Sequence, residues 1–204
     1  MTTPQPATAG APPVVVVSGN PRPGSRTLRV GRAVGEAVAG SIGADHGDPA
    51  VSVADIEVSA FGADLFVAPD ARPAALLDAL QTIRTASLLV VATPVYKASY
   101  TGLLKAFLDH YQAGELSSVV AIPVVVAGGP AHTFVGELYL RPLLTELGAV
   151  LPTPAFTITE GQLPELATVA ADWAGRYGDV LARQLAGATG SDPGRREALG
   201  VAGG

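Results

Sequence analysis

The residues best suited to chemistry in this chain form a polar turn, Ser18–Thr27, directly behind a run of four valines. The valine run predicts a strand buried on both faces. After the turn, apolar residues recur at three- and four-residue spacing from Leu28 to Val38 and predict a helix. The start of such a helix offers free backbone N–H groups and a positive dipole end to an anion. The turn adds amide, hydroxyl and guanidinium groups, and its candidate phosphate-binding residues are Asn20, Arg22, Ser25, Arg26 and Thr27.

Two better-known phosphate loops do not match this turn. Gly19 and Gly24 have the spacing of the P-loop glycines, but Ser25-Arg26 stands where that motif has lysine followed by serine or threonine, which argues against a nucleoside triphosphatase. The dinucleotide fingerprint G-x-G-x-x-G is missing here as well. A plain alternative remains open, in which Ser25 or Thr27 only caps the helix.

A second polar segment, Thr93–Gly102, follows another continuous apolar run. Pro94 favours an extended chain, and Tyr96 and Tyr100 place two aromatic rings beside exposed peptide groups. A flat heteroaromatic ligand needs such a surface together with backbone donors and acceptors at its polar edge. The candidate ring-binding residues are Pro94, Val95, Tyr96 and Lys97. The alternative is that the tyrosines pack at a surface or interface and Lys97 is only solvated.

A glycine pair, Gly128-Gly129, ends a third apolar run and would let backbone approach a ring closely. His132 follows it. We interpret this histidine as a loop or capping residue rather than a proton donor, because no carboxylate is positioned in the sequence to orient it.

Strands and helices alternate five times along the chain, as in a parallel sheet with helices on both faces. Pro123 predicts a bulge or interruption in the fourth strand, and Pro142 predicts a bend in the fourth helix. In such folds ligands bind beyond the carboxyl ends of the strands, so the three polar segments should converge. The predicted strands are 14–17, 51–56, 87–93, 119–127 and 153–159, and the predicted helices are 25–40, 74–86, 100–109, 133–147 and 164–185.

Composition narrows the functional classes. The 204 residues suit one domain, and the absence of cysteine excludes disulfides, thiolate nucleophiles and cysteine-based metal sites. A net charge of −5 with 13 basic residues argues against nucleic acid or an anionic membrane as a partner. No apolar run approaches the roughly 20 residues of a membrane span, and the N-terminus does not resemble a signal peptide. We therefore expect a cytoplasmic protein with a domain over 14–186 between flexible tails at 1–13 and 187–204.

Three segments together resemble the NAD(P)H-dependent FMN reductases, most closely those that supply alkanesulfonate monooxygenases: Gly19–Thr27, Ala92–Lys105 and Ala127–His132. The resemblance implies a flavodoxin-like three-layer sandwich with strand order 2-1-3-4-5. It also implies hydride transfer from NADPH or NADH to FMN, a homodimer or homotetramer, and a flavin-dependent monooxygenase as possible recipient of reduced FMN. Within that family the phosphate loop corresponds to Arg22, Ser25 and Thr27, and the ring lies between Pro94–Lys97 and Gly128-Gly129.

Some alternatives stay open at this stage. Certain sulfonate-type relatives have an extra tyrosine in the helix after the glycine pair, and this tyrosine is associated with release of reduced flavin. Here Tyr139 stands in the corresponding helix, but the segment is one residue shorter. The sequence therefore does not decide whether FMN is exchanged as a substrate or retained. A quinone, azo-dye or metal-ion reductase with bound FMN, a flavodoxin-type electron carrier and a nonenzymatic phospho-ligand binder are the other interpretations.

Overall fold

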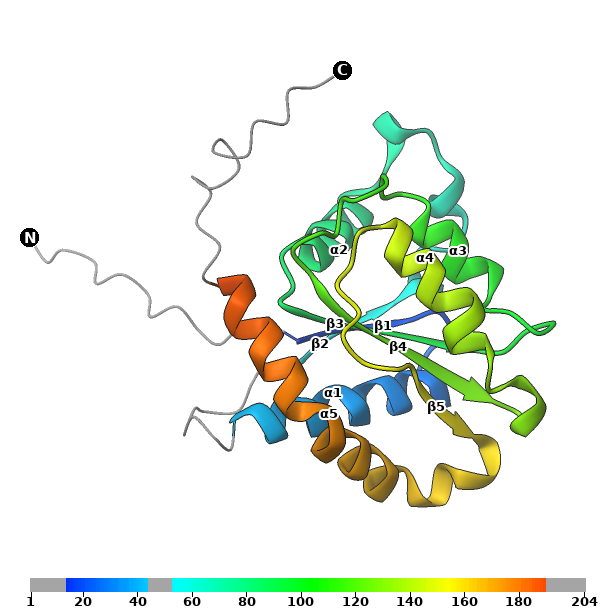
Figure 1. The fold of residues 1–204 in the computed structure, drawn as a ribbon. Coiled ribbons are helices and arrows are strands. Elements are labelled where there is room, and N and C mark those ends of the chain that lie inside the picture. The colour runs from blue at the N-terminus through cyan, green and yellow to red at the C-terminus, as the bar shows by residue number, and fades with distance from the viewer. Residues whose placement is uncertain (1–13, 44–52, 190–204) are drawn as a thin grey trace, which may run out of the picture.

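Five parallel strands form one sheet in the order β2-β1-β3-β4-β5, in a computed structural model that describes residues 14–43 and 53–189 (Figure 1). The predicted order is confirmed. All five residues of β1 are buried, as the valine run predicts, whereas β2 lies at an edge and has exposed residues. The strands are β1 (Val14–Ser18), β2 (Val53–Glu57), β3 (Leu88–Pro94), β4 (Val120–Ala127) and β5 (Phe156–Thr159).

Helices cover both faces of the sheet, and alternate strand residues serve the two layers. Val15 and Val17 pack in the cluster beneath α2, α3 and α4, while Val14 and Val16 pack in the cluster with α1 and α5. Figure 1 shows the two groups of helices on opposite sides of the strands. The predicted three-layer arrangement is therefore confirmed. The α-helices are α1 (Arg26–Gly43), α2 (Ala74–Arg84), α3 (Gly102–Leu108), α4 (Arg141–Glu146) and α5 (Leu166–Thr189).

Short helical turns fill several connections. Three 3-10 turns follow β2, one follows β4, and one precedes α5, while a π-helical turn leads into α4. Their bounds are η1 (Val58–Ala60), η2 (Gly62–Phe66), η3 (Pro69–Ala71), η4 (Pro130–His132), η5 (Gly136–Leu140) and η6 (Glu160–Glu165).

The prediction of a bulge at Pro123 is wrong, because β4 runs without interruption and Pro123 pairs in register with Val91 of β3. Backbone N–H groups alternate in direction along a strand, so the nitrogen of Pro123 faces the same side as that of Ala121, which donates to the carbonyl of Val150. Pairing with β5 begins only at Val124. The proline therefore falls where the neighbouring chain takes no ladder hydrogen bond, and its missing donor is tolerated.

The predicted helix 133–147 is split rather than simply bent. Pro142 stands in the first turn of α4, where its missing N–H is tolerated. Upstream, the backbone N–H of Arg141 bonds to the carbonyl of Gly136, five residues back, as in a π-helix. The wider turn thus replaces the regular α-helical bonds that a proline inside the helix would break.

The predicted strand 153–159 begins three residues later, at Phe156. The preceding segment contains two prolines, and its backbone is satisfied by side chains instead of a neighbouring strand. Arg141 donates to the carbonyls of Leu151 (3.1 Å) and Thr153, and Ala155 donates its N–H to Glu137 (2.6 Å). Arg141 and Glu137 are themselves paired at 2.5 Å. One ion pair therefore completes the hydrogen bonding of this segment.

The first and last helices are longer than predicted. α1 continues past Gly40 to Gly43, and α5 continues past 185 to Thr189. They pack against each other so closely that a Cβ at Gly178 would lie 2.4 Å from the hydroxyl oxygen of Ser41. This tertiary contact outweighs the tendency of Gly40 to end the first helix. The first three residues of the expected tail 187–204 belong to α5. The rest of that tail, the expected tail 1–13 and residues 51–52 of the predicted second strand lie outside the described residues.

Among the helices that the structure describes, none is long and apolar enough to cross a membrane. Within residues 14–43 and 53–189, no group of three or more histidine, aspartate or glutamate side chains is arranged to hold a metal ion.

Candidate functional site

The loops that follow β1, β3 and β4 leave the sheet at the carboxyl ends of neighbouring parallel strands, and hydrogen bonds join the first loop to the second and the second loop to β4. The N–H of Gly19 donates to the carbonyl of Ala92 at 2.8 Å, and the hydroxyl of Thr101 donates to the carbonyl of Gly19 at 2.5 Å. The N–H of Val95 donates to the carbonyl of Val126 at 3.3 Å. The predicted convergence of the three polar segments is therefore observed.

The first loop is held in shape by its own polar side chains. Asn20 donates to the hydroxyl of Thr27 and accepts from the N–H of Arg22, both at 2.9 Å. Ser25 accepts from the N–H of Leu28 at 3.2 Å, so it caps α1 as the simpler interpretation predicts. Thr27 is buried, whereas Arg22 is exposed. Asn20 and Thr27 thus form the framework of the loop rather than free donors.

The two arginines of this loop differ in their engagement. Arg26 is ion-paired with Glu160 at 2.8 Å. The guanidinium of Arg22 makes no hydrogen bond or ion pair with the part of the chain that the structure describes. Arg22 is therefore the guanidinium available to an anion at the N-terminus of α1.

The second loop is a tight hairpin turn. Tyr96 and Ser99 exchange backbone hydrogen bonds of 2.9 and 3.1 Å, and the two residues between them, Lys97 and Ala98, have φ of 51° and 59°. This left-handed pair is typical of a type I′ turn, which normally takes Gly or Asn. Each non-glycine residue in that region costs roughly 1–2 kcal/mol. The turn is therefore strained, and it holds Tyr96 half-exposed at its base.

Two of the remaining residues of this loop pack inward. Val95 contacts a small cluster containing Val125 and Val135, and Tyr100 packs against the main core. Tyr100 is thus mainly a core residue. Lys97, at the tip, is exposed.

The third loop leaves room for a ligand. A Cβ placed at Gly128 or Gly129 would meet no atom within 4 Å. Gly129 is extended, and Pro130–His132 form η4. The ring of His132 lies 6.5 Å from that of Phe134, and no carboxylate hydrogen-bonds to the histidine among the described contacts, consistent with a loop residue.

Sequence reasoning overlooked Thr101, Glu57 and Glu160. Thr101 is buried, and its hydroxyl caps α3 by accepting from the N–H of Leu104. Its own backbone N–H donates to the hydroxyl of Thr93. A threonine just before a predicted helix is an N-cap signal that could have identified it. Glu57 accepts from the N–H of Gly24 at 2.8 Å. Its position at the end of β2, in register with Ser18, was the available clue.

The base of the site is closely packed. A Cβ at Gly19 would lie 2.6 Å from the Cβ of Leu104, so only glycine fits between the first loop and α3. The site therefore has a closely packed side at Gly19 and an open side at Gly128-Gly129.

Comparison with known proteins assigns the family. The model of the NADPH-dependent FMN reductases matches residues 12–162. The chain belongs to this family. It is 36% identical over 140 residues to an FMN reductase (NADPH) of Pseudomonas aeruginosa, covering 67% of this chain and 71% of that protein. It is 41% identical over 81 residues to the NADH-dependent FMN reductase SfnF of Pseudomonas fluorescens, covering 38% of this chain and 42% of that protein.

Solved structures agree with the fold. An oxidoreductase from Corynebacterium diphtheriae superposes with a TM-score of 0.72 at 31% identity, covering 86% of this chain and 97% of that one. The apo form of an NADH:FMN oxidoreductase, EMOB, superposes with a TM-score of 0.70 at 29% identity, covering 91% and 94%. The interpretation of the chain as a flavodoxin-like NAD(P)H-dependent FMN reductase, with FMN and NADPH or NADH as its cofactors, is confirmed.

Proposed function

We propose that this reductase binds FMN across the three neighbouring loops, with the phosphate at Asn20–Thr27 and the ring between Pro94–Lys97 and Gly128-Gly129. The observation that carries the proposal is the meeting of the three loops at the carboxyl ends of neighbouring strands, where the first two are hydrogen-bonded to each other and the glycine pair of the third leaves open space. Ligands of open parallel sheets bind at such an edge.

The donors of the first loop suit a phosphate. Backbone N–H groups at the start of α1 offer a positive dipole end, and the unpaired guanidinium of Arg22 adds a full charge. Ser25 supports the loop by capping α1 and lies 3.4 Å from the hydroxyl of Ser18. Arg26 and Thr27 are not free to donate directly to the phosphate, because they are already bonded to Glu160 and Asn20, and they support the loop instead.

The second and third loops suit a flat ring. Tyr96 and Val95 provide apolar surface on one side, and Gly128-Gly129 provide accessible backbone on the other. Lys97 supplies positive charge near a ring that becomes anionic on reduction. When bound, FMN supplies the hydride chemistry by accepting a hydride from the nicotinamide. The residues of the chain bind and orient the two rings and exclude water, so proximity provides most of the acceleration.

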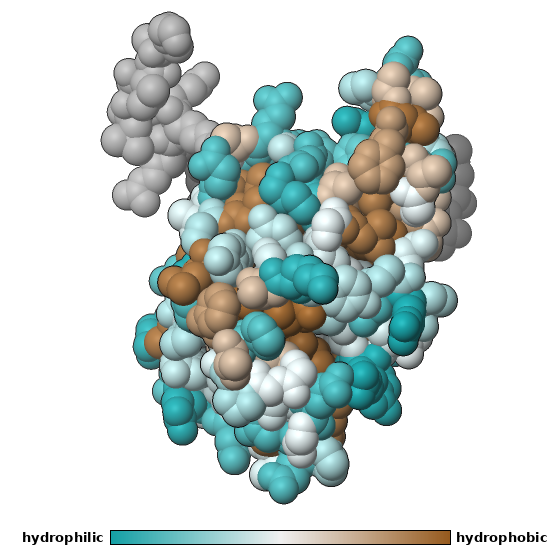
Figure 2. All heavy atoms as spheres, turned by 90° about the vertical axis from the view of Figure 1, so that its right-hand side faces the viewer, coloured by the Kyte–Doolittle hydropathy of each residue, from teal (hydrophilic) through white to brown (hydrophobic). Residues whose placement is uncertain are grey.

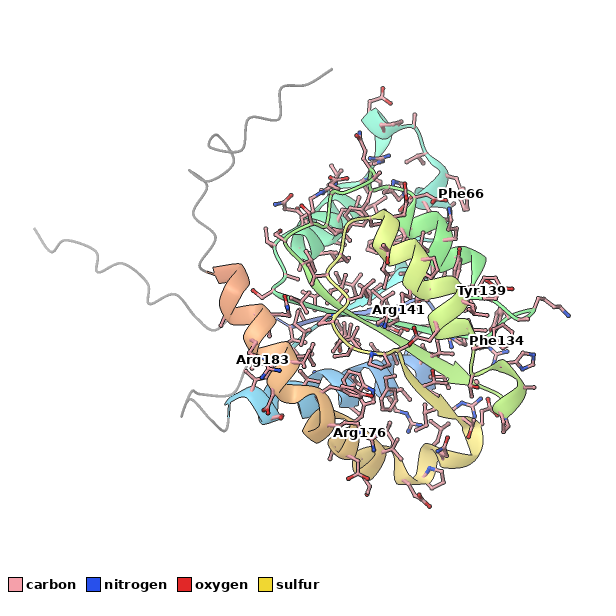
Figure 3. All side chains as sticks on the ribbon, in the orientation of Figure 1. Phe66, Phe134, Tyr139, Arg141, Arg176 and Arg183 are labelled. Carbon is pink, nitrogen blue, oxygen red and sulfur yellow. The ribbon has the colours of Figure 1, made fainter. Side chains whose placement is uncertain are left out.

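We further propose that the chain acts in the cytoplasm as a homodimer or homotetramer. The support is an exposed apolar group on the turn that precedes α4: Phe134 is 37% exposed, Leu138 65% and Tyr139 44%. The rings of Phe134 and Tyr139 lie 6.0 Å apart, and Figure 3 shows them on the same side of the molecule. Figure 2 shows apolar surface distributed over this side. Exposed groups of this kind mark association surfaces.

We also propose that reduced FMN leaves for a flavin-dependent monooxygenase. This requires FMN to behave as a substrate. The test is steady-state oxidation of NADPH and NADH by purified protein with and without added FMN, together with the absorption spectrum of the protein as isolated. Strict dependence on added FMN supports an exchangeable flavin. A yellow protein that reduces quinones or azo dyes without added FMN contradicts it, and no flavin-dependent oxidation above that with free FMN contradicts the enzyme itself.

The phosphate assignment has its own test. Arg22→Ala removes a charge-assisted donor, so FMN binding should weaken by roughly 1.5–3 kcal/mol, and Ser25→Ala should weaken it by about 0.5–1.5 kcal/mol. Arg29→Ala is the matched control, because Arg29 is also exposed and one turn further along α1. Riboflavin, which lacks the phosphate, should be almost insensitive to all three. Equal losses for both flavins would remove the assignment.

A further inference from the structure

Two carboxylates occupy donors of the first loop. Glu57, the last residue of β2, accepts from the N–H of Gly24 at 2.8 Å. Glu160, directly after β5, accepts from the guanidinium of Arg26 at 2.8 Å. The two acids stand at the ends of the two outer strands of the sheet, β2 and β5. They lie 33 and 134 residues away in the sequence from the groups they bind. Each takes a donor that a phosphate could otherwise use.

We propose that Glu57 and Glu160 weaken the hold of the loop on the flavin phosphate and thereby keep FMN exchangeable. The inference rests on the proposed function, since it concerns the phosphate site assigned there. It names what sets the affinity of that site: a carboxylate fixed beside a phosphate-binding loop repels the phosphate and competes for its donors.

The charges support this direction. A phosphate monoester carries close to two negative charges at neutral pH. Of the two loop arginines, Arg26 is already ion-paired with Glu160, whereas Arg22 has no ion-pair partner within residues 14–43 and 53–189. Glu57 adds a further negative charge in contact with the loop backbone. A loop built for permanent retention of a dianion would present these groups unpaired.

The bond from Gly24 also explains how the loop keeps its shape without a ligand. Gly24 has φ of +60° and its N–H points to Glu57. The carboxylate therefore stabilises the loop before flavin arrives. When a phosphate binds, this hydrogen bond either breaks or leaves the negative charge of Glu57 beside the phosphate. An amide at position 57 would keep the acceptor and remove the charge.

Glu57→Gln and Glu160→Gln test the proposal, separately and together. Glu146→Gln is the control, because Glu146 is an exposed glutamate at the end of α4, away from the first loop. Its backbone carbonyl accepts from the N–H of Gly114, before β4 begins. Titration by flavin fluorescence quenching should show FMN dissociation constants about three- to tenfold lower for each site variant at low salt. Riboflavin binding should not change, and Glu146→Gln should match wild type.

The effect should shrink as salt is raised, since part of it is screened electrostatic repulsion. Glu57→Ala separates charge from structure: it removes the acceptor too, so it should lose part of the gain seen with glutamine. Wild-type preference for FMN over riboflavin without any tightening in Glu57→Gln or Glu160→Gln overturns this inference alone. Equal tightening for riboflavin overturns it as well. Wild type that binds both flavins equally overturns the phosphate assignment and the inference together.

Discussion

Removing the hydroxyl of Thr101 should loosen the junction between the first two loops. That hydroxyl donates to the carbonyl of Gly19 and accepts from the N–H of Leu104 as the cap of α3, and the side chain is only 2% exposed. Thr101→Val keeps the shape and deletes both bonds. Losing the cap costs about 1 kcal/mol, and leaving a buried carbonyl without its partner costs about 1–3 kcal/mol. We expect Thr101→Val to lower the free energy of unfolding by about 2–4 kcal/mol.

Thr101→Ser is the matched control, because it keeps the hydroxyl and removes one methyl group, at a cost of about 1 kcal/mol. The measurement is urea unfolding, accepted only where the denaturant slope stays the same in all three proteins. FMN titration of the folded variants should show weaker binding for valine than for serine, since Gly19 starts the loop that we assign to the phosphate. A valine variant as stable as the serine variant would refute this account of the junction.

Four further substitutions test the contrast between the packed and open parts of the site, the strained turn of the second loop and the ion pair of Glu137. Gly19→Ala should lower stability by about 1–3 kcal/mol, whereas Gly128→Ala, which enters open space, should change it by less than about 0.5 kcal/mol and weaken flavin binding; thermal melts and flavin titrations of the pair decide this. Ala98→Gly should raise the melting temperature, because relief of roughly 1–2 kcal/mol of left-handed strain exceeds a glycine entropy cost of about 0.5–1 kcal/mol. Burial would raise the pKa of Glu137, but hydrogen bonds from Arg141 and a backbone N–H, with the charge of the arginine, hold it below the ordinary pKa of a glutamate. Its ionised form therefore stabilises the fold above that ordinary pKa and the contribution is lost as pH falls through the lowered pKa, so Glu137→Gln should be less stable than wild type at neutral pH and approach it in acid, as urea unfolding at both pH values will show.

The parallel sheet and the meeting of the loops follow from local patterns in the sequence, whereas the strand order was predicted only through the family resemblance. Continuous apolar runs such as Val14–Val17 mark strands buried on both faces, and alternation with helices requires a parallel sheet. In a parallel sheet the loops after successive strands share one edge. Patterns within about ten residues were therefore enough to predict a parallel sheet covered by helices and to bring Asn20–Thr27, Pro94–Lys97 and Gly128-Gly129 together.

The interruptions depend on partners that are distant in the sequence. Pro123 is harmless because the chain opposite it takes no ladder bond, and that chain is free to leave the sheet because Arg141 and Glu137 satisfy its backbone. Local reasoning judged the proline by its own strand and therefore predicted a bulge. The acids at the first loop were missed for the same reason, since Glu160 acts on a residue 134 positions away.

The packed and open sides of the site suit two different tasks. At the base, Gly19 fits against Leu104 with no room for a methyl group and Thr101 locks the loops together, so the position of the first loop is fixed before any ligand binds. At the rim, Gly128-Gly129 and the half-exposed Tyr96 leave space. A reductase that aligns two flat rings in turn needs a fixed anchor for one of them and an accessible face for the other. In the binding mode that we propose, Glu57 and Glu160 already engage part of this anchor, so the same arrangement would combine precise alignment of FMN with its ready release.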